Sequence, residues 1–472
     1  MIYEKTDVVI VGAGPAGLFA ANSLIKRGVR GEDIVIVDGG KRMDQRRCPK
    51  TQACNCSTCD IMEGEGGSGG FSDGKNTYSL TRGTQLEQIF DPEDEHLLKD
   101  IDDTFLQNGW QGKLSFPLPS APQEFNGTRF RFDSYLLRHL GSDGIREFII
   151  NFTESLRKAG VRIYTRHEVI HLLWTTGGEK AVWGVMAVNS NGEKVSIRAR
   201  KTFVATGLQG VPWLEEELVS RGGLELGVGP AGIGMRVEAP YKALEPLFER
   251  FYDFKLVYES GGMSFRSFCC NRKGWITNEN HRTLGVRNVN GHSYLIEPKS
   301  NMSNFAIICK VDININPDPQ SFVRSIAKSI NYLPEDRGHT VAQTLADFLV
   351  GIPTNEGREG LSIRTNLQAR VGVNIGNALP KQLYDGFASF LRDLGKVVEL
   401  PLNTTWIYAP EVKYFGRKLP VNFKTWKCEG IKDLYVIGNA SGYLDSFVSA
   451  ALTGVIAARE LAGELQTKEE EL

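Results

Sequence analysis

A glycine-rich turn between a short apolar strand and a helix constrains the fold of this 472-residue chain more than any other feature. Residues 7–11 predict a buried strand, residues 12–17 (Gly-Ala-Gly-Pro-Ala-Gly) predict the turn, and residues 18–27 have helical composition. A second apolar strand, residues 34–38, completes a βαβ unit. The turn fits the G-x-G-x-x-G fingerprint, and an acid, Asp38, ends the second strand.

This context favours a dinucleotide-binding site. Gly12 permits the tight turn, Gly14 lets the backbone approach a pyrophosphate, and Gly17 lets the helix pack close to the sheet. The helix N-terminus offers unpaired N–H groups to phosphates. Asp38 is placed to bind ribose hydroxyls.

A second literal match to the fingerprint, residues 227–232, lacks this context. No clear strand precedes it, and Pro240 would interrupt a following helix. We therefore expect Gly229 to contact no nucleotide phosphate. The chain then has a single nucleotide fold, and NAD(P)H is at most a transient redox partner.

Two further segments resemble the FAD motifs of glutathione-reductase-type flavoproteins. Residues 435–442 resemble the strand and turn beside the ribityl chain, although Asn439 replaces the usual Asp and carries no charge. Ala205-Thr206-Gly207 resembles the Ala-Thr-Gly turn of the same group. Together with the N-terminal turn, these matches indicate FAD as the cofactor.

The glycine-rich run at residues 64–75 ends in Phe-Ser-Asp-Gly-Lys, which is unusual for a flexible linker. Glycines let a backbone approach a planar ligand, so this run favours a loop that faces the flavin. The fingerprint, this run, Arg47-Cys48-Pro49, Asn290-Gly291-His292-Ser293 and Pro410-Glu411-Val412-Lys413 resemble the uncharacterised FAD-dependent dehydrogenases. The resemblance extends nearly end to end and implies FAD and redox chemistry, but no substrate.

We expect an α/β fold: a discontinuous Rossmann-like FAD-binding domain (1–211, with a Cys/Gly-rich loop at 41–84, and 401–472) and an inserted mixed α/β substrate domain (212–400). The residues expected to bind the cofactor are Gly12, Gly14, Pro15, Ala16, Gly17, Asp38, Gly39, Gly67, Gly69, Ser72, Gly74, Val169, Ala205, Thr206, Gly207, Gly438, Asn439 and Ser449.

Four cysteines, Cys48, Cys54, Cys56 and Cys59, lie within twelve residues. Thiolates at such spacing could bind zinc or an iron–sulfur cluster, although the C-x-C spacing departs from the common C-x-x-C. A redox dithiol and plain buried thiols are the alternatives. The spacing does not decide among them.

Three residues are candidates for the chemistry. His292 follows an Asn-Gly pair and could act as an acid or base beside the flavin, although a lone histidine is more often structural. Lys75 and Lys413 could place positive charge near the flavin, and solvated lysines are the competing interpretation.

The composition narrows the function classes. A net charge of −1 argues against nucleic-acid binding, and no apolar run is long enough to span a bilayer. With no export signal visible, we expect a cytoplasmic protein. The first hypothesis is an FAD-dependent oxidoreductase acting on a small molecule. The alternatives are an RNA-modifying flavoprotein and a non-catalytic electron carrier, and the oligomeric state is open.

Overall fold

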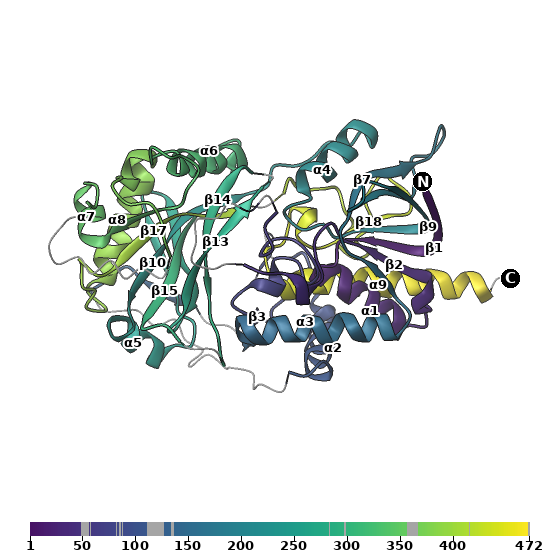
Figure 1. Cartoon of the computed structure of the whole chain (residues 1–472), viewed down its shortest axis with the longest axis horizontal. Coiled ribbons are helices and arrows are strands. Elements are labelled where there is room, and N and C mark those ends of the chain that lie inside the picture. Colours follow the sequence, from purple (N-terminus) through teal and green to yellow (C-terminus); the bar gives the residue numbers. More distant parts are fainter. Residues whose placement is uncertain are drawn as a thin grey trace.

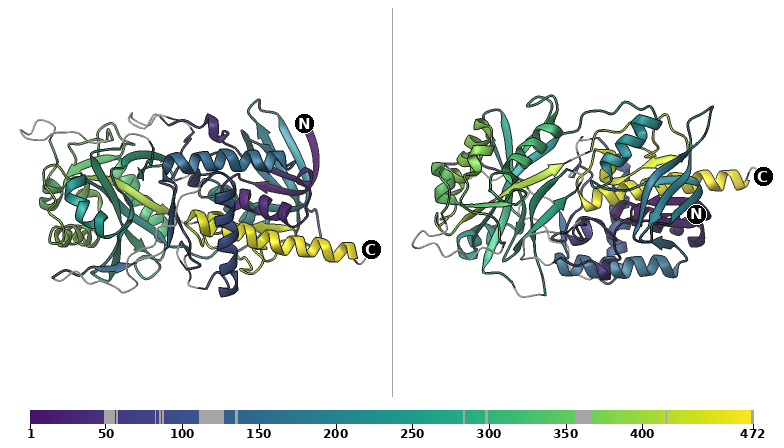
Figure 2. Two further views of the ribbon diagram at one scale, coloured as in Figure 1. Left: turned by 90° about the horizontal axis from the view of Figure 1, so that it is seen from below. Right: turned by 45° about the horizontal axis from the view of Figure 1, so that its top comes forward.

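The computed structural model describes residues 1–48, 56, 58–81, 83–84, 86, 88–110, 127–133, 136–282, 284–296, 299–355, 367–414 and 416–470. Two sheets lie at opposite ends of the molecule, each with its own helices (Figure 1). The views in Figure 2 show the same arrangement, with the C-terminal helix extending away from the second sheet. Among the described residues, no helix is long and apolar enough to cross a membrane.

The first sheet has seven strands in the order β6-β2-β1-β9-β8-β7, with β18 beside β9. Strands β1, β2, β6, β9 and β18 run parallel, and β7 and β8 are antiparallel. The bounds are β1 Ile2–Val11, β2 Ile34–Val37, β6 Arg162–Tyr164, β7 His167–Trp174, β8 Val182–Asn189, β9 Lys194–Val204 and β18 Leu434–Val436.

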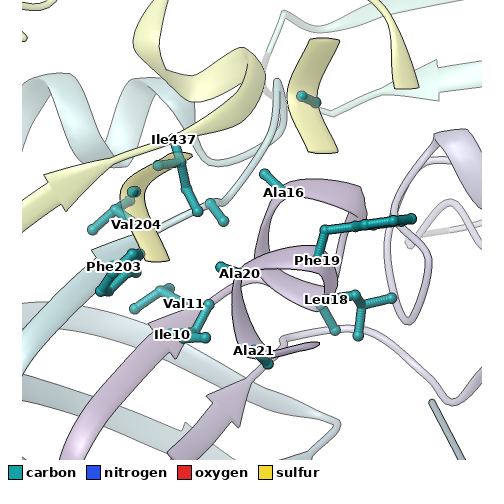
Figure 3. Packing of buried hydrophobic residues seen from close by; sticks show 14 of the residues in the cluster. Ile10, Val11, Ala16, Leu18, Phe19, Ala20, Ala21, Phe203, Val204 and Ile437 are labelled. Carbon is teal, nitrogen blue, oxygen red and sulfur yellow. The ribbon is translucent and has the colours of Figure 1, made fainter. Parts of the chain in front are cut away.

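Helices cover this sheet and bury its apolar strands. The bounds are α1 Pro15–Lys26, α2 Glu95–Gln107, α3 Gly141–Lys158, α4 Val211–Glu216 and α9 Phe447–Glu470. Small residues on α1, such as Ala16 and Ala20, let it pack against both the strands and α9. Figure 3 shows Ala16, Ala20, Val11 and Ile437 among the buried side chains at this junction.

The second sheet is antiparallel throughout, in the order β16-β17-β10-β15-β12-β11-β4. A hairpin, β13–β14, is a separate two-stranded sheet, as is the pair β3–β5. The bounds are β3 Lys75–Thr77, β4 Arg131–Asp133, β5 Leu137–His139, β10 Ala231–Pro240, β11 Lys255–Ser260, β12 Met263–Asn271, β13 Trp275–His281, β14 Val286–His292, β15 Met302–Val311, β16 Val341–Thr344 and β17 Trp406–Tyr414.

The two faces of the second sheet have different surroundings. One face joins a hydrophobic core with helices of this unit, and odd-numbered residues of β10 such as Ile233 and Met235 lie in that core. The other face carries Arg236 and Glu238, which contact the β13–β14 hairpin and β17. The helix bounds are α5 Tyr241–Arg250, α6 Pro319–Asn331, α7 Leu345–Val350 and α8 Lys381–Leu394.

The expected fold class is confirmed: a Rossmann-like α/β unit is joined to a separate antiparallel-sheet unit. The domain boundaries at residues 211 and 400 stay a prediction. The second sheet includes two strands from outside 212–400, β4 and β17, which pair with β11 and β10. Sheet pairing joins segments far apart in sequence, and local sequence patterns do not report it.

Candidate functional site

The carboxyl ends of four parallel strands meet at one edge of the first sheet. Val11 of β1 pairs with Val37 of β2 and with Val204 of β9, and Val204 pairs with Val436 of β18. The segments that follow these strands are the four that the sequence indicated for the cofactor. Ligands bind at this edge in open parallel sheets, and a cavity of about 940 Å³ begins here.

The three glycines of the N-terminal turn are explained by different features of the structure. Gly12 has φ +107°, and a Cβ there would collide with the Ala205 carbonyl. A Cβ at Gly17 would collide with the Gly12 carbonyl, which agrees with the expected close packing. Gly14 differs, because its backbone is extended (φ −78°) and a Cβ would meet nothing nearer than the Gly67 Cα, 3.9 Å away. The chain itself does not require glycine at 14, but a ligand in the cavity would.

Asp38 supports the turn directly. Its carboxylate accepts hydrogen bonds from the Ala13 and Gly40 N–H groups, both at 2.8 Å. The half-buried side chain also lines the cavity. Carboxylate oxygens have room for further donors, so the ribose contact stays a prediction beside this observed role.

The glycine-rich run packs onto the fingerprint turn. The Gly66 N–H donates to the Ala13 carbonyl (2.8 Å), and Gly67, with φ +57°, lies against Gly14. Gly69 approaches the Phe447 ring at the start of α9. This loop therefore forms a wall of the cavity, as a flavin-facing loop would.

Most of the expected cofactor residues line this one cavity. They are Gly12, Gly14, Pro15, Ala16, Asp38, Gly39, Gly67, Gly69, Ser72, Val169, Ala205, Thr206, Gly207, Gly438 and Asn439. Gly17, Gly74 and Ser449 are absent from the described lining. Gly74, with φ +73°, packs against Gly141, and the Ser449 hydroxyl donates to the Gly83 carbonyl at 3.1 Å. Gly83 is in the cavity lining, so Ser449 supports the wall through this hydrogen bond.

Lys75 lines the cavity inside a charged network. Its ammonium lies 3.2 Å from the Asp73 carboxylate and 4.0 Å from the Asp253 carboxylate, and it donates to the Cys270 carbonyl. Burial by itself would lower the pKa of Lys75, but the two carboxylates raise it above its usual value. Lys75 is therefore a buried cation with partners rather than a solvated one.

His139 joins the same network. One ring nitrogen lies 3.0 Å from the Asp73 carbonyl and the other lies 2.5 Å from the Tyr252 hydroxyl. Burial, and then the charge of Lys75, lower the pKa of His139 to about 4. The imidazole is neutral at pH 7.

His292 lies away from the cavity wall. It is 2% exposed, and its Nδ1 is 3.3 Å from the Tyr294 hydroxyl. It is absent from the described lining, although its neighbour Asn290 is present. An acid–base role for His292 stays a prediction, and its position supports the structural alternative.

The hairpin supplies a histidine that sequence reasoning missed. His281 lines the cavity with Glu279, and its Nε2 is 3.6 Å from that carboxylate. Burial would raise the pKa of Glu279, but His281 and hydrogen bonds from Asn290 and Asn288 lower it to about 2. The alternation of Glu279 and His281 along β13 was the available signal, since both side chains then share a face.

Lys413 on β17 lines the cavity on the side of the second sheet, with its Nζ 3.8 Å from the centroid of the Phe268 ring. The expected division placed Lys413 in the FAD-binding part at 401–472, whereas its strand belongs to the second sheet. Its proposed electrostatic role beside a flavin is untested.

The cysteine cluster is described only in part, because Cys54 lies outside the described residues. Burial raises the pKa of the Cys59 thiol to about 11, and the Asn280 N–H lies 3.4 Å from its sulfur. Cys56 is exposed and Cys48 half-buried. Within the described ranges, no group of three His, Cys, Asp or Glu side chains is arranged to hold a metal, and zinc or an iron–sulfur cluster stays a prediction.

The second glycine motif does not open a helix. Residues 227–230 lead directly into β10 at Ala231, and the next helix starts only at Tyr241. A Cβ at Gly229 would meet the Gly416 carbonyl and the Gln320 side chain, so this glycine is required by packing. The absence of a phosphate contact at Gly229 stays a prediction.

Comparison with known proteins supports the cofactor. Residues 5–99 match the family described as FAD binding domain. An uncharacterized protein of Clostridium beijerinckii is 22% identical over 245 residues, which cover 51% of this chain but only 38% of the relative's length. The class defined by this match and by the cavity is an FAD-binding flavoprotein.

Two solved structures match most of this chain at low sequence identity. A flavoprotein/dehydrogenase from Cytophaga hutchinsonii has 13% identity and a TM-score of 0.43, covering 98% of this chain and 79% of that one. A geranylgeranyl bacteriochlorophyll reductase-like protein from Thermoplasma acidophilum has 12% identity and a TM-score of 0.40, with coverage of 99% and 80%. These values do not transfer a reaction to this chain.

Proposed function

We propose that this protein is an FAD-dependent oxidoreductase, a dehydrogenase or reductase that moves a hydride between flavin N5 and a small organic substrate. The observation that carries the proposal is the continuity of one cavity. It runs from the glycine turn, where Gly14 leaves space the chain does not need, to side chains of the second sheet such as Lys413. FAD supplies the hydride chemistry when bound, and the protein orients the substrate.

The residues of this chain divide into two tasks. The first unit binds the dinucleotide: the N-terminus of α1 has no acidic residue in its first turn and presents free N–H groups to phosphates. The second unit shapes the remaining cavity with fixed polar groups. The Arg236 guanidinium donates two hydrogen bonds to Glu411 there, at 2.5 and 2.8 Å, and fixes the orientation of that carboxylate.

Two of the described histidines line the cavity, and His281 is the candidate for proton transfer at the substrate because His167 lies on β7 of the first sheet. His281 is on the cavity wall, and its Nε2 lies 3.6 Å from the Glu279 carboxylate, which orients the ring beside the cavity. We assign it the acid–base role in preference to His292, because His281 is among the described lining residues and His292 is not. An electron carrier would need no such chamber.

An anaerobic screen tests the function. Oxidised holoenzyme is mixed with panels of metabolites and with NADH and NADPH, and dithionite-reduced holoenzyme with candidate acceptors, while flavin absorbance is followed. We expect at least one organic compound to change the flavin redox state at least 100-fold faster than it does with free FAD. His281→Gln should slow that reaction while retaining FAD. If no compound exceeds the free-FAD rate in either direction, the enzyme proposal fails and the carrier alternative gains support.

A further inference from the structure

The second sheet presents one continuous row of side chains to the cavity. The pairing runs Arg131 to Val257, Val257 to Arg266, Arg266 to Ile308, and Ile308 to Gly234, across five strands. Directly paired residues lie on the same face of a sheet. The wall opposite the nucleotide half therefore carries Val257 between two arginines, with Ile308 next to Arg266.

A second set of cations lies beside this row. Lys310 and Lys413 both pair with Gly232, one from each neighbouring strand. Because residue 232 has no side chain, its neighbours approach closely across β10: a Cβ there would lie 2.8 Å from Ile308 Cγ2 and 3.1 Å from Lys413 Cβ. The glycine thus leaves the space above β10 to side chains of the two flanking strands, Ile308 of β15 and Lys413 of β17.

An aromatic ring occupies the centre of this surface. The Phe268 ring centroid is 3.8 Å from the Lys413 ammonium, 5.1 Å from Lys255 and 5.6 Å from the Arg266 guanidinium. Cation–π contacts of this kind orient the three charges around the ring. The half-exposed ring also offers a face on which an apolar or planar group can lie.

Some of the charges on this surface are paired within the protein. Lys255 is paired with Asp253 (3.0 Å), and Glu411 is paired with Arg236. Glu259, on the same face, is exposed and accepts from the Ser264 hydroxyl at 2.7 Å.

Four cations on the cavity wall have no carboxylate partner within 4 Å among the described residues. These are Arg131, Arg266, Lys310 and Lys413. Among the described acids of the cavity wall without a lysine or arginine partner, Asp38 and Asp445 belong to the nucleotide-binding unit, and Glu279 lies beside His281 on the β13–β14 hairpin. The positive charge is therefore concentrated at the end of the cavity away from the glycine turn.

Resting on the proposed oxidoreductase function, we propose that the substrate is a small organic acid with two or more anionic groups, carboxylates or phosphates. Arg266, Lys310, Lys413 and Arg131 bind these groups, and the carbon skeleton lies on Phe268 and Ile308. Guanidinium and ammonium donors recognise such anions by charge-assisted hydrogen bonds.

Binding is tested without turnover. Holoenzyme is titrated with succinate, glutarate, propane-1,2,3-tricarboxylate and inorganic pyrophosphate, with succinamide as the neutral counterpart, and perturbation of the flavin absorbance gives each Kd. The pyrophosphate arm separates a preference for phosphate from one for carboxylate. The variants are Arg266→Gln and Lys310→Gln, and the matched control is Lys242→Gln, which removes an exposed charge of α5 outside the cavity lining. FAD affinity is measured for every variant.

We expect at least one anion to bind more tightly than succinamide, and each cavity variant to weaken it about 10-fold or more, in line with the loss of a charge-assisted hydrogen bond. Lys242→Gln should leave the Kd unchanged. Equal weakening in the control, no anion binding below 10 mM, or a loss of FAD affinity in the cavity variants would overturn the proposal. Anion binding without any turnover in the redox screen would instead uphold this site and refute the oxidoreductase function.

Discussion

Replacing Gly14 by valine should have little effect on the stability of the apoprotein but a large effect on its affinity for FAD. The backbone at Gly14 is extended, with φ −78° and ψ −178°, a conformation open to any residue. A Cβ would have no atom nearer than 3.9 Å. The apoprotein should therefore fold, while the new side chain occupies the cavity in front of α1.

The two expected magnitudes differ widely. For folding, a glycine N-cap replaced by a residue without a capping group costs about 0.5–1 kcal/mol. For the cofactor, the side chain would displace the pyrophosphate from the Ala16 and Gly17 N–H groups, and hydrogen bonds to a charged group contribute about 1.5–3 kcal/mol each. Losing both weakens FAD by about 3–6 kcal/mol, or roughly 10²–10⁴-fold.

Two measurements on deflavinated protein give these values. Quenching of flavin fluorescence on titration gives the Kd for FAD, and urea unfolding followed by circular dichroism gives the free energy of unfolding. Gly463→Val is the matched control, because Gly463 is an exposed position of α9 with nothing within 4 Å of a Cβ. Gly12→Ala is the opposite control and should lower the stability of the apoprotein, since φ is +107° and the Cβ would meet Ala205.

Unchanged FAD affinity in Gly14→Val, with a folded apoprotein, would refute the placement of the pyrophosphate at this turn. A fall in the apoprotein's stability well beyond 1 kcal/mol would refute the inference that the chain tolerates a side chain there.

Two further predictions concern the walls of the cavity. Burial is the larger cause and the charge of Lys75 the smaller cause that lower the pKa of His139 to about 4, from 6.5 in the unfolded chain. Between pH 6.5 and 4 the unfolded chain therefore binds more protons than the folded protein. The free energy of unfolding falls on acidification, by up to about 3 kcal/mol. His139→Asn should flatten this fall in urea titrations of FAD-saturated protein at pH 7, 6 and 5, and an equal slope would contradict the assignment. Arg236→Met should lower the free energy of unfolding by about 3–5 kcal/mol, because it leaves Glu411 buried without its partner. Arg236→Met with Glu411→Gln should regain part of that loss, and no recovery would place the cost elsewhere.

Several features were readable in the sequence because they depend on local backbone requirements. A tight turn and a close helix–strand approach demand glycine at positions 12 and 17, and a bulky residue at either would collide with nearby backbone. The order of strand, turn and helix could be predicted from the pattern of apolar residues, because this pattern too depends on residues close together in the sequence. The segment at 435–442, which we expect to contact FAD, could be located because it too is a short strand followed at once by small residues.

Other features were decided only by the tertiary structure. The Asp38 carboxylate accepts hydrogen bonds from two backbone N–H groups, and His292 lies away from the cavity. The residues next to Asp38 and His292 in the sequence predict neither arrangement. The basic surface is assembled from residues as far apart as Arg131 and Lys413. Alternation along one strand shows which side chains share a face, but the pairing between strands sets which faces meet. That pairing joins strands far apart in the sequence. The basic surface on the proposed substrate side of the cavity could therefore be identified only from the tertiary structure.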